Sequence, residues 1–197
     1  MAVAVEHDKR REEILEKALA VFMDDGFENA TFQKIADRCG ITRTILYLYF
    51  KNKKDIFKFS LKQLLLSAEE NINSLRADKS LSVVEKITKV LFAVYKLLEQ
   101  NRQLLIVVLD YLLHLSKSEK DPEERVRRRT VKIRHVLSAL LIEGVKSGEI
   151  KKCNIKAAND YLYSFVESAI YQLCVLKRKN LSELKETTSF AIKQLCG

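Results

Sequence analysis

Apolar residues recur every three or four positions along most of the chain, which is the spacing of one face of an α-helix. The first such stretch, over 8–25, is followed by Gly26. Glycine readily takes the left-handed conformation that ends a helix, so the pattern predicts a helix that ends at residue 25. The residues of its apolar face are Ile14, Leu15, Ala18, Leu19 and Phe22.

Two short helices joined by a tight turn are predicted next. Thr31 is a suitable N-cap for a helix over 32–39, which Gly40 ends, and Thr42 caps a helix that starts at Arg43. By residue type the stretch 45–50 is typical of a buried β-strand, but the turn and the caps favour a helix. Ile41 has the spacing of a hydrophobic staple to the new helix, whose predicted inward residues are Ile45, Leu46 and Phe50.

Long helices are predicted for the rest of the chain. Asn52 caps a fourth helix that runs to about residue 74, and further helices are expected over 81–100, 102–116, 122–147, 155–178 and 181–196. Pro122 marks a helix start and Gly148 a helix end. One proline and five glycines are too few for a turn-rich β protein, so the predicted fold class is all-α.

The composition places the chain among ordinary globular proteins, with 47% hydrophobic and 31% charged residues. Apolar runs such as 104–109 span six residues, against the ~20 needed to cross a bilayer. The amino terminus lacks the features of a signal peptide. We therefore expect a cytoplasmic protein with no membrane segment.

No motif in the sequence indicates a metal, a cofactor or catalysis. The four cysteines are scattered without a C-x-x-C pair, so free buried thiols are expected rather than a zinc site. Asp110 and His114 have a spacing that permits metal ligation, but a hydrogen bond between them is the favoured interpretation. The chain also lacks a nucleophile–base pair or a phosphate loop, and a helical enzyme is the less favoured alternative.

The basic charge gathers around the two short helices. The net charge is +9, and 43–62 holds six basic residues and one acidic residue. Such a cluster is typical of an electrostatic surface for a polyanion. A second basic run, at Arg125 and 127–129, follows Glu123 and Glu124 and is interpreted as a solvated helix face.

The two short helices form a helix-turn-helix, whose second helix can enter the major groove of DNA. Arg43 can donate two hydrogen bonds to a guanine edge, and Lys53 lies at a helix start where phosphate can bind. Hydroxyl groups suited to phosphate oxygens come from Thr31, Thr42, Tyr47 and Tyr49. Considered separately, the two tyrosines could simply be half-buried core residues, and Lys51, Lys53 and Lys54 a solvated face. The turn and the spacing together favour DNA binding.

The run TFQKIADRCGITRTILYLYFKNKKDIF resembles the DNA-binding domain of tetracycline-repressor-like (TetR-family) transcription regulators. The residues that match the family pattern are Thr31, Ile35, Ala36, Gly40, Leu46, Tyr47, Tyr49, Phe50, Asn52 and Lys53. The resemblance implies that Gln33, Arg43 and Thr44 face the bases. It also implies phosphate contacts from Thr31, Thr42, Tyr47, Tyr49 and Lys53.

The chain departs from that pattern at three positions. Thr44 replaces a frequent glycine, and Cys39 stands where alanine is usual. Ile45 replaces a small or hydroxyl residue, so a phosphate contact that some relatives make from this position is not expected here.

The resemblance implies a DNA-reading domain over 1–52 and a helical effector-binding and dimerisation domain over 53–197, with 53–75 as a stem. We expect a homodimer that binds double-stranded DNA at a palindromic operator and represses transcription until a small hydrophobic effector releases it. A repressor controlled by a partner protein, without an effector, is the alternative. The expected pocket residues are Phe92, Tyr95, Leu109, Asp110, Tyr111, His114, Phe165 and Tyr171, with Gln172 as a further polar candidate, and the expected dimer residues are Phe165, Ala169, Leu173 and Leu184.

Overall fold

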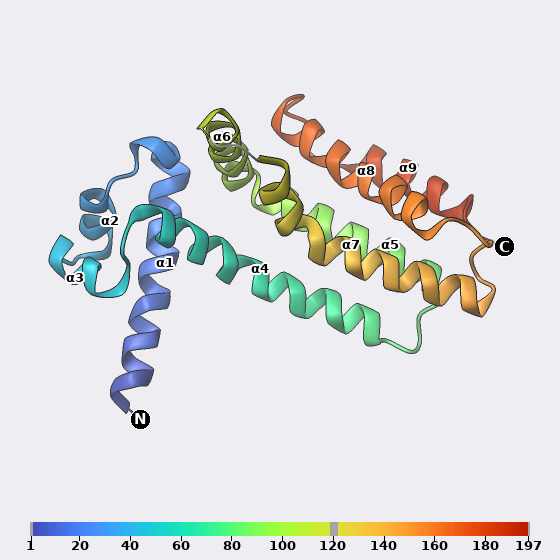
Figure 1. Cartoon of the computed structure of the whole chain (residues 1–197), viewed down its shortest axis with the longest axis horizontal. Coiled ribbons are helices and arrows are strands. Elements are labelled where there is room, and N and C mark those ends of the chain that lie inside the picture. Colours follow the sequence, from blue (N-terminus) through green and yellow to red (C-terminus); the bar gives the residue numbers. More distant parts are fainter. Residues whose placement is uncertain (1, 119–121, 197) are drawn as a thin grey trace. The chain divides into compact units, whose positions relative to one another are not determined.

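The computed structural model describes residues 2–118 and 122–196, with the side chains of all of these except 2–5, 67, 114–118 and 122–131. These residues form α-helices without a β-sheet, which confirms the predicted all-α class. The helices in Figure 1 are α1 (Ala2–Asn29), α2 (Phe32–Cys39), α3 (Arg43–Tyr49), α4 (Lys53–Ala77), α5 (Val83–Gln100), α6 (Arg102–Ser118), α7 (Pro122–Ser147), α8 (Ile155–Cys174) and α9 (Ser182–Lys193). None of the described helices is long and apolar enough to cross a membrane.

The helices belong to two compact units. The amino-terminal unit comprises residues 1–67 together with 106–114, and the carboxy-terminal unit comprises 68–105 and 115–197. Both α4 and α6 therefore contribute residues to each unit.

Aromatic side chains fill the core of the amino-terminal unit. Phe22, Phe27 and Phe57 are buried, with ring centroids 4.9–5.8 Å apart. Tyr111 of α6 joins them at 4.4 Å from Phe27 and 5.2 Å from Phe57. Gly26 interrupts the helical geometry of α1 with a φ of 76°, close to the predicted helix end, and the last turn of α1 follows it.

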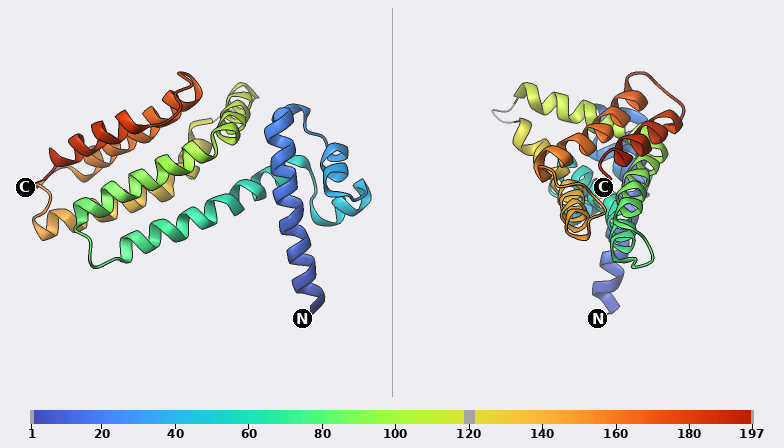
Figure 2. Two further views of the ribbon diagram at one scale, coloured as in Figure 1. Left: turned by 180° about the vertical axis from the view of Figure 1, so that it is seen from behind. Right: turned by 90° about the vertical axis from the view of Figure 1, so that its right-hand side faces the viewer.

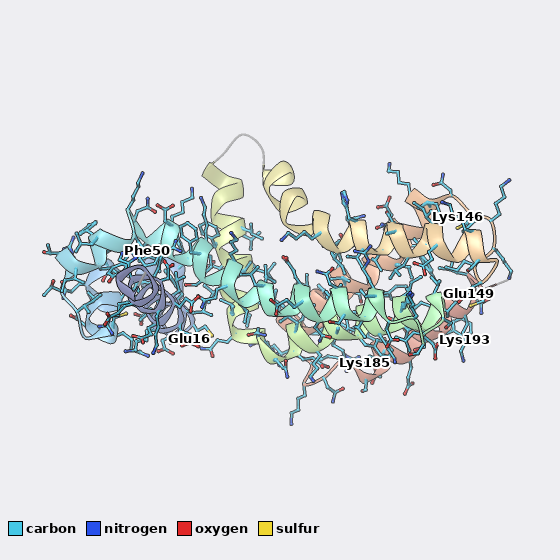
Figure 3. All side chains as sticks on the ribbon, turned by 90° about the horizontal axis from the view of Figure 1, so that it is seen from below. Glu16, Phe50, Lys146, Glu149, Lys185 and Lys193 are labelled. Carbon is cyan, nitrogen blue, oxygen red and sulfur yellow. The ribbon has the colours of Figure 1, made fainter. Side chains whose placement is uncertain are left out.

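The carboxy-terminal unit is built around α5, α7, α8 and α9, which run side by side in both views of Figure 2. Its core is aliphatic, and one polar pair crosses it, since the hydroxyl groups of Tyr95 and Thr188 lie 2.8 Å apart and both residues are fully buried. Ser82 and Glu85 form a capping box at the start of α5. Glu149, labelled in Figure 3, accepts a hydrogen bond from the backbone N–H of Val83.

The predicted helix boundaries differ from the structure mainly at two ends. α1 begins at Ala2 rather than near residue 8, so the helix includes the polar segment that precedes its apolar face. α8 ends at Cys174 instead of 178, and Lys177 then takes a positive φ of 52° in the connection to α9.

Candidate nucleic-acid interface

Backbone hydrogen bonds and threonine caps fix the turn between α2 and α3. Gly40 ends α2 with a φ of 69°, and its N–H donates to carbonyls of the last turn of α2. Thr31 Oγ1 accepts from the N–H of Lys34, and Thr42 Oγ1 accepts from the N–H of Ile45. A threonine hydroxyl that accepts in this way keeps its own proton for donation, so capping does not prevent a contact to phosphate.

The inward face of α3 is narrower than the sequence predicts. All seven residues of α3 are described, and Leu46 alone is buried, while Phe50 is buried just after the helix. The prediction that Ile45 points inward is wrong, because 40% of its surface is exposed. Leu48 is 75% exposed. Because α3 is short, only the line of side chains through Leu46 packs against α2. Ile45 is rotated by 100° around the helix axis from Leu46 and therefore lies outside this contact.

Arg43, Tyr47 and Phe32 form a connected group on one side of α3. Arg43 Nη2 donates to Tyr47 Oη over 3.3 Å, and the guanidinium carbon lies 5.9 Å from the Tyr47 ring centroid. The Tyr47 ring stacks on Phe32 of α2 at 4.5 Å. Tyr47 is nevertheless 51% exposed, so its hydroxyl and the guanidinium both remain accessible from solvent.

The other residues predicted to face bases are also on the surface. Gln33 is exposed, and its Nε2 donates to Asp37 Oδ1 over 2.7 Å, so the amide lies along α2 in this structure. Thr44 is exposed on α3, next to Arg43. The structure therefore places Gln33, Arg43 and Thr44 on exposed positions of the two helices.

Tyr49 has a partner that the sequence analysis missed. The ring of His7, from the first turns of α1, stacks on Tyr49 with centroids 4.6 Å apart and planes at 22°. Arg11, one turn later, lies over the rings of Phe50 and Phe59 at 5.3 and 4.4 Å. The start of α1 thus supports the end of α3, and no local sequence pattern signals a contact between residues so far apart in the chain.

Lys53 is hydrogen-bonded to the end of α1. Its Nζ donates to the carbonyls of Phe27 and Glu28 at 2.9 and 2.8 Å and lies 4.8 Å from the Phe27 ring centroid. These carbonyls belong to the last turn of α1, where a positive charge is favourable. An ammonium group has three N–H donors, so one is left for an outside acceptor.

The residues predicted to line an effector pocket are divided between the two compact units, and the pocket stays a prediction. Tyr95 is fully buried with its hydroxyl bonded to Thr188, and burial raises its pKa to about 12. Phe92 packs beside Tyr95, while Tyr171 is 54% exposed. Leu109, Asp110 and Tyr111 belong to the other compact unit, and the side chain of His114, like the basic run at 125–129, lies outside the described residues.

Three of the four residues predicted for the dimer interface are core residues of their own chain. Ala169, Leu173 and Leu184 are 0–5% exposed, which removes them from any surface, and only Phe165 is partly accessible. These three residues lie on the apolar faces of α8 and α9, and a helix buries its apolar face first in its own bundle. The apolar side chains that α8, α9 and the segment between them expose are Tyr161, Tyr171, Val175, Leu176 and Phe190.

Comparison with known proteins agrees with this geometry. Residues 14–58, which contain α2 and α3, match the family described as "Bacterial regulatory proteins, tetR family". A fatty acid metabolism regulator protein of Bacillus subtilis is 28% identical over 163 residues, covering 80% of each chain. The transcriptional repressor KstR2 of Mycolicibacterium smegmatis is 28% identical over 142 residues, covering 72% of this chain and 68% of the relative.

Solved structures share the complete fold. A TetR transcription regulator from Haloarcula marismortui superposes with a TM-score of 0.79 at 18% identity, covering 96% of this chain and 97% of that one. FadR from Bacillus subtilis, solved in complex with stearoyl-CoA, gives a TM-score of 0.74 at 23% identity, covering 91% and 96%. Residues 14–58, with the helix-turn-helix of α2 and α3, form a TetR-family DNA-binding domain, and the relatives and shared fold support a TetR-family transcription regulator.

Proposed function

We propose that this regulator is a homodimeric repressor that binds a palindromic operator and is released by an effector with a long apolar part. The observation that carries the effector response in this proposal is the position of Tyr111. It comes from α6, yet it is 2% exposed in the aromatic core of the unit that holds α2 and α3.

A displacement of α6 would act on the DNA-reading helices through this core. Residues 106–114 of α6 belong to the amino-terminal unit, while the ends of the same helix belong to the carboxy-terminal unit. Packed cores resist continuous deformation, so a shift of Tyr111 must be accommodated by Phe27 and Phe57. In this proposal the reading domain ends at residue 52, and 53–75 acts as the stem that carries the shift.

The effector class is proposed from the relatives. The relative from Bacillus subtilis that covers 80% of this chain is named as a fatty acid metabolism regulator. A fatty acid or its coenzyme A thioester would bury a long hydrocarbon chain, at about 0.8 kcal/mol for each CH₂ group. Such a ligand would need a largely apolar site, which matches the expected small hydrophobic effector.

Dimerisation is proposed through α8 and α9. The exposed apolar residues of these helices would be covered by a second copy, and removing apolar surface from water stabilises a complex by about 25 cal/mol per Å². Two copies on one operator would place two α3 helices in successive major grooves, one DNA turn or ~34–36 Å apart.

The test has two stages, which separate DNA recognition from effector response. The purified protein is first used to select fragments from a random DNA library, and an inverted repeat is expected in the selected sequences. Operator affinity is then measured by fluorescence anisotropy with and without oleoyl-CoA, stearoyl-CoA, oleate and free coenzyme A as the matched control.

A tenfold or greater loss of affinity with an acylated compound, but not with coenzyme A, would support the proposal. Selection of a specific inverted repeat whose affinity no acyl compound changes would favour a repressor controlled by a partner protein. A protein that enriches no sequence at any salt concentration would overturn the DNA-binding function itself.

A further inference from the structure

We infer that Thr44, Ile45 and Leu48 of α3 form an apolar surface that reads thymine methyl groups in the operator. The inference rests on the proposed binding of an operator by this helix and adds the base chemistry that the helix recognises. Arg43, the one charged residue of α3, accounts for at most one or two guanines, so the remaining contacts of the helix must be of another kind.

The geometry of α3 places these three residues together on its outer side. At 100° per residue, positions 44, 48 and 45 follow one another around the helix within an arc of about 100°. Leu48 is at the centre of this arc, nearly opposite the buried Leu46, and it is 75% exposed. Ile45 is 40% exposed at the edge of the arc, and Thr44 is exposed as well.

The polar residues of α3 lie beside this surface rather than on it. Arg43 and Tyr47 are bonded to each other, and Tyr47 is stacked on Phe32. The face that points away from the protein therefore carries two aliphatic side chains and the methyl group of a threonine. In the major groove, thymine is the base that presents a methyl group, and apolar contact with that group distinguishes it from the other bases.

Double-stranded DNA fits this surface better than a second protein chain does. A stable protein interface buries roughly 800 Å² on each partner, which seven residues of helix with three apolar side chains cannot supply. The residues around the surface are also basic, since Arg43 precedes it and Lys51, Lys53 and Lys54 follow it. Positive charge next to an apolar surface suits a groove bordered by phosphates.

The decisive experiment removes single methyl groups from the operator. Each thymine of one selected half-site is replaced in turn by deoxyuridine, which keeps base pairing and lacks only the methyl group. Affinity for each probe is measured with the native protein and with Ile45→Ala, Leu48→Ala and Arg43→Ala. Circular dichroism checks that each variant is folded, and a thymine outside the selected repeat provides the control position.

Native protein should lose about fourfold in affinity for each contacted methyl group. Leu48→Ala or Ile45→Ala should bind thymine and deoxyuridine probes equally at the position that it reads, while Arg43→Ala should keep the full response to deoxyuridine there. These two outcomes together would assign the methyl contact to the aliphatic residues rather than to the helix in general.

Three results would overturn the inference. Specific operator binding that no deoxyuridine substitution changes would leave the repressor function intact and remove the methyl contact. An equal response in the native protein and in the Ile45 and Leu48 variants would assign the effect to DNA shape. A change in subunit association of Leu48→Ala in the absence of DNA would show that the surface binds protein. Failure to select any operator would instead count against the proposed function.

Discussion

Tyr95 and Thr188 allow a direct test of whether α9 is tied to α5 by a buried hydrogen bond. Both side chains are fully buried, and their oxygens are 2.8 Å apart. Tyr95→Phe removes the hydrogen-bond partner that the structure shows for the Thr188 hydroxyl. Thr188→Val removes the partner of the Tyr95 hydroxyl. A buried polar group that loses its partner costs about 1–3 kcal/mol, so each single variant should be destabilised by that amount.

The double variant provides the control, because it leaves neither hydroxyl behind. Replacing both partners by apolar groups of similar shape can be nearly neutral, so Tyr95→Phe with Thr188→Val should be less destabilised than either single variant. Urea unfolding followed by circular dichroism measures the free energies at one fixed protein concentration, since a dimer's stability depends on concentration. Amide hydrogen exchange in α9 localises the effect.

Additive single effects, or a Tyr95→Phe variant as stable as the native protein, would refute the reasoning. In that case Thr188 would not stabilise the Tyr95 hydroxyl.

Three further predictions concern pH, DNA and assembly. Burial raises the pKa of Tyr95 from 10.0 to about 12. The stability that its protonated hydroxyl contributes below pH 10 should therefore be lost as the pH rises through 12. In urea unfolding, Tyr95→Phe should lack this part of the pH profile. Arg43→Ala should lower operator affinity by about 1–3 kcal/mol and relax the preference at one base, measured by binding to an operator library. Lys53→Ala should instead weaken binding to all sequences alike. It should also lower the thermal stability of the protein, because the contacts of Lys53 to Phe27 and Glu28 are lost. Phe190→Glu, at a side chain that is 66% exposed, should give a helical monomer by sedimentation, and a dimer that persists would exclude α9 from the interface.

Local chemistry explains which parts of the fold could be predicted from the sequence. Thr31, Gly40 and Thr42 form their capping hydrogen bonds with residues no more than four positions away in the chain. The structure contains the caps and the turn that these residues predict. The start of α7 at Pro122 and its end just before Gly148 follow from similar local signals. These elements need no tertiary contact to be specified.

Side-chain environments depended on contacts that no local pattern contains. Ile45 has the spacing of a core residue, but α2 covers only the ridge of Leu46. His7 reaches Tyr49 because α1 starts at Ala2, and Lys53 meets the carbonyls of the last turn of α1, which is 25 residues earlier. On α8 and α9 the most apolar residues were predicted to form the interface, whereas the bundle buries Ala169, Leu173 and Leu184 and exposes other apolar side chains such as Tyr171 and Phe190.

The free energy of the contacts around Phe27 is large enough for effector binding to change the DNA affinity of α3. Phe27 touches Tyr111 of α6 at 4.4 Å and lies under the ammonium group of Lys53, the first residue of α4, at 4.8 Å. One buried aromatic contact is worth about 0.5–1.5 kcal/mol, and 1.4 kcal/mol corresponds to a tenfold change in affinity. In the proposed repressor, an effector that pulls Tyr111 from Phe27 would therefore weaken operator binding up to about tenfold for each subunit. With two subunits on one operator, as proposed, the two losses would multiply to about 100-fold, so release would need no larger rearrangement of the reading helices.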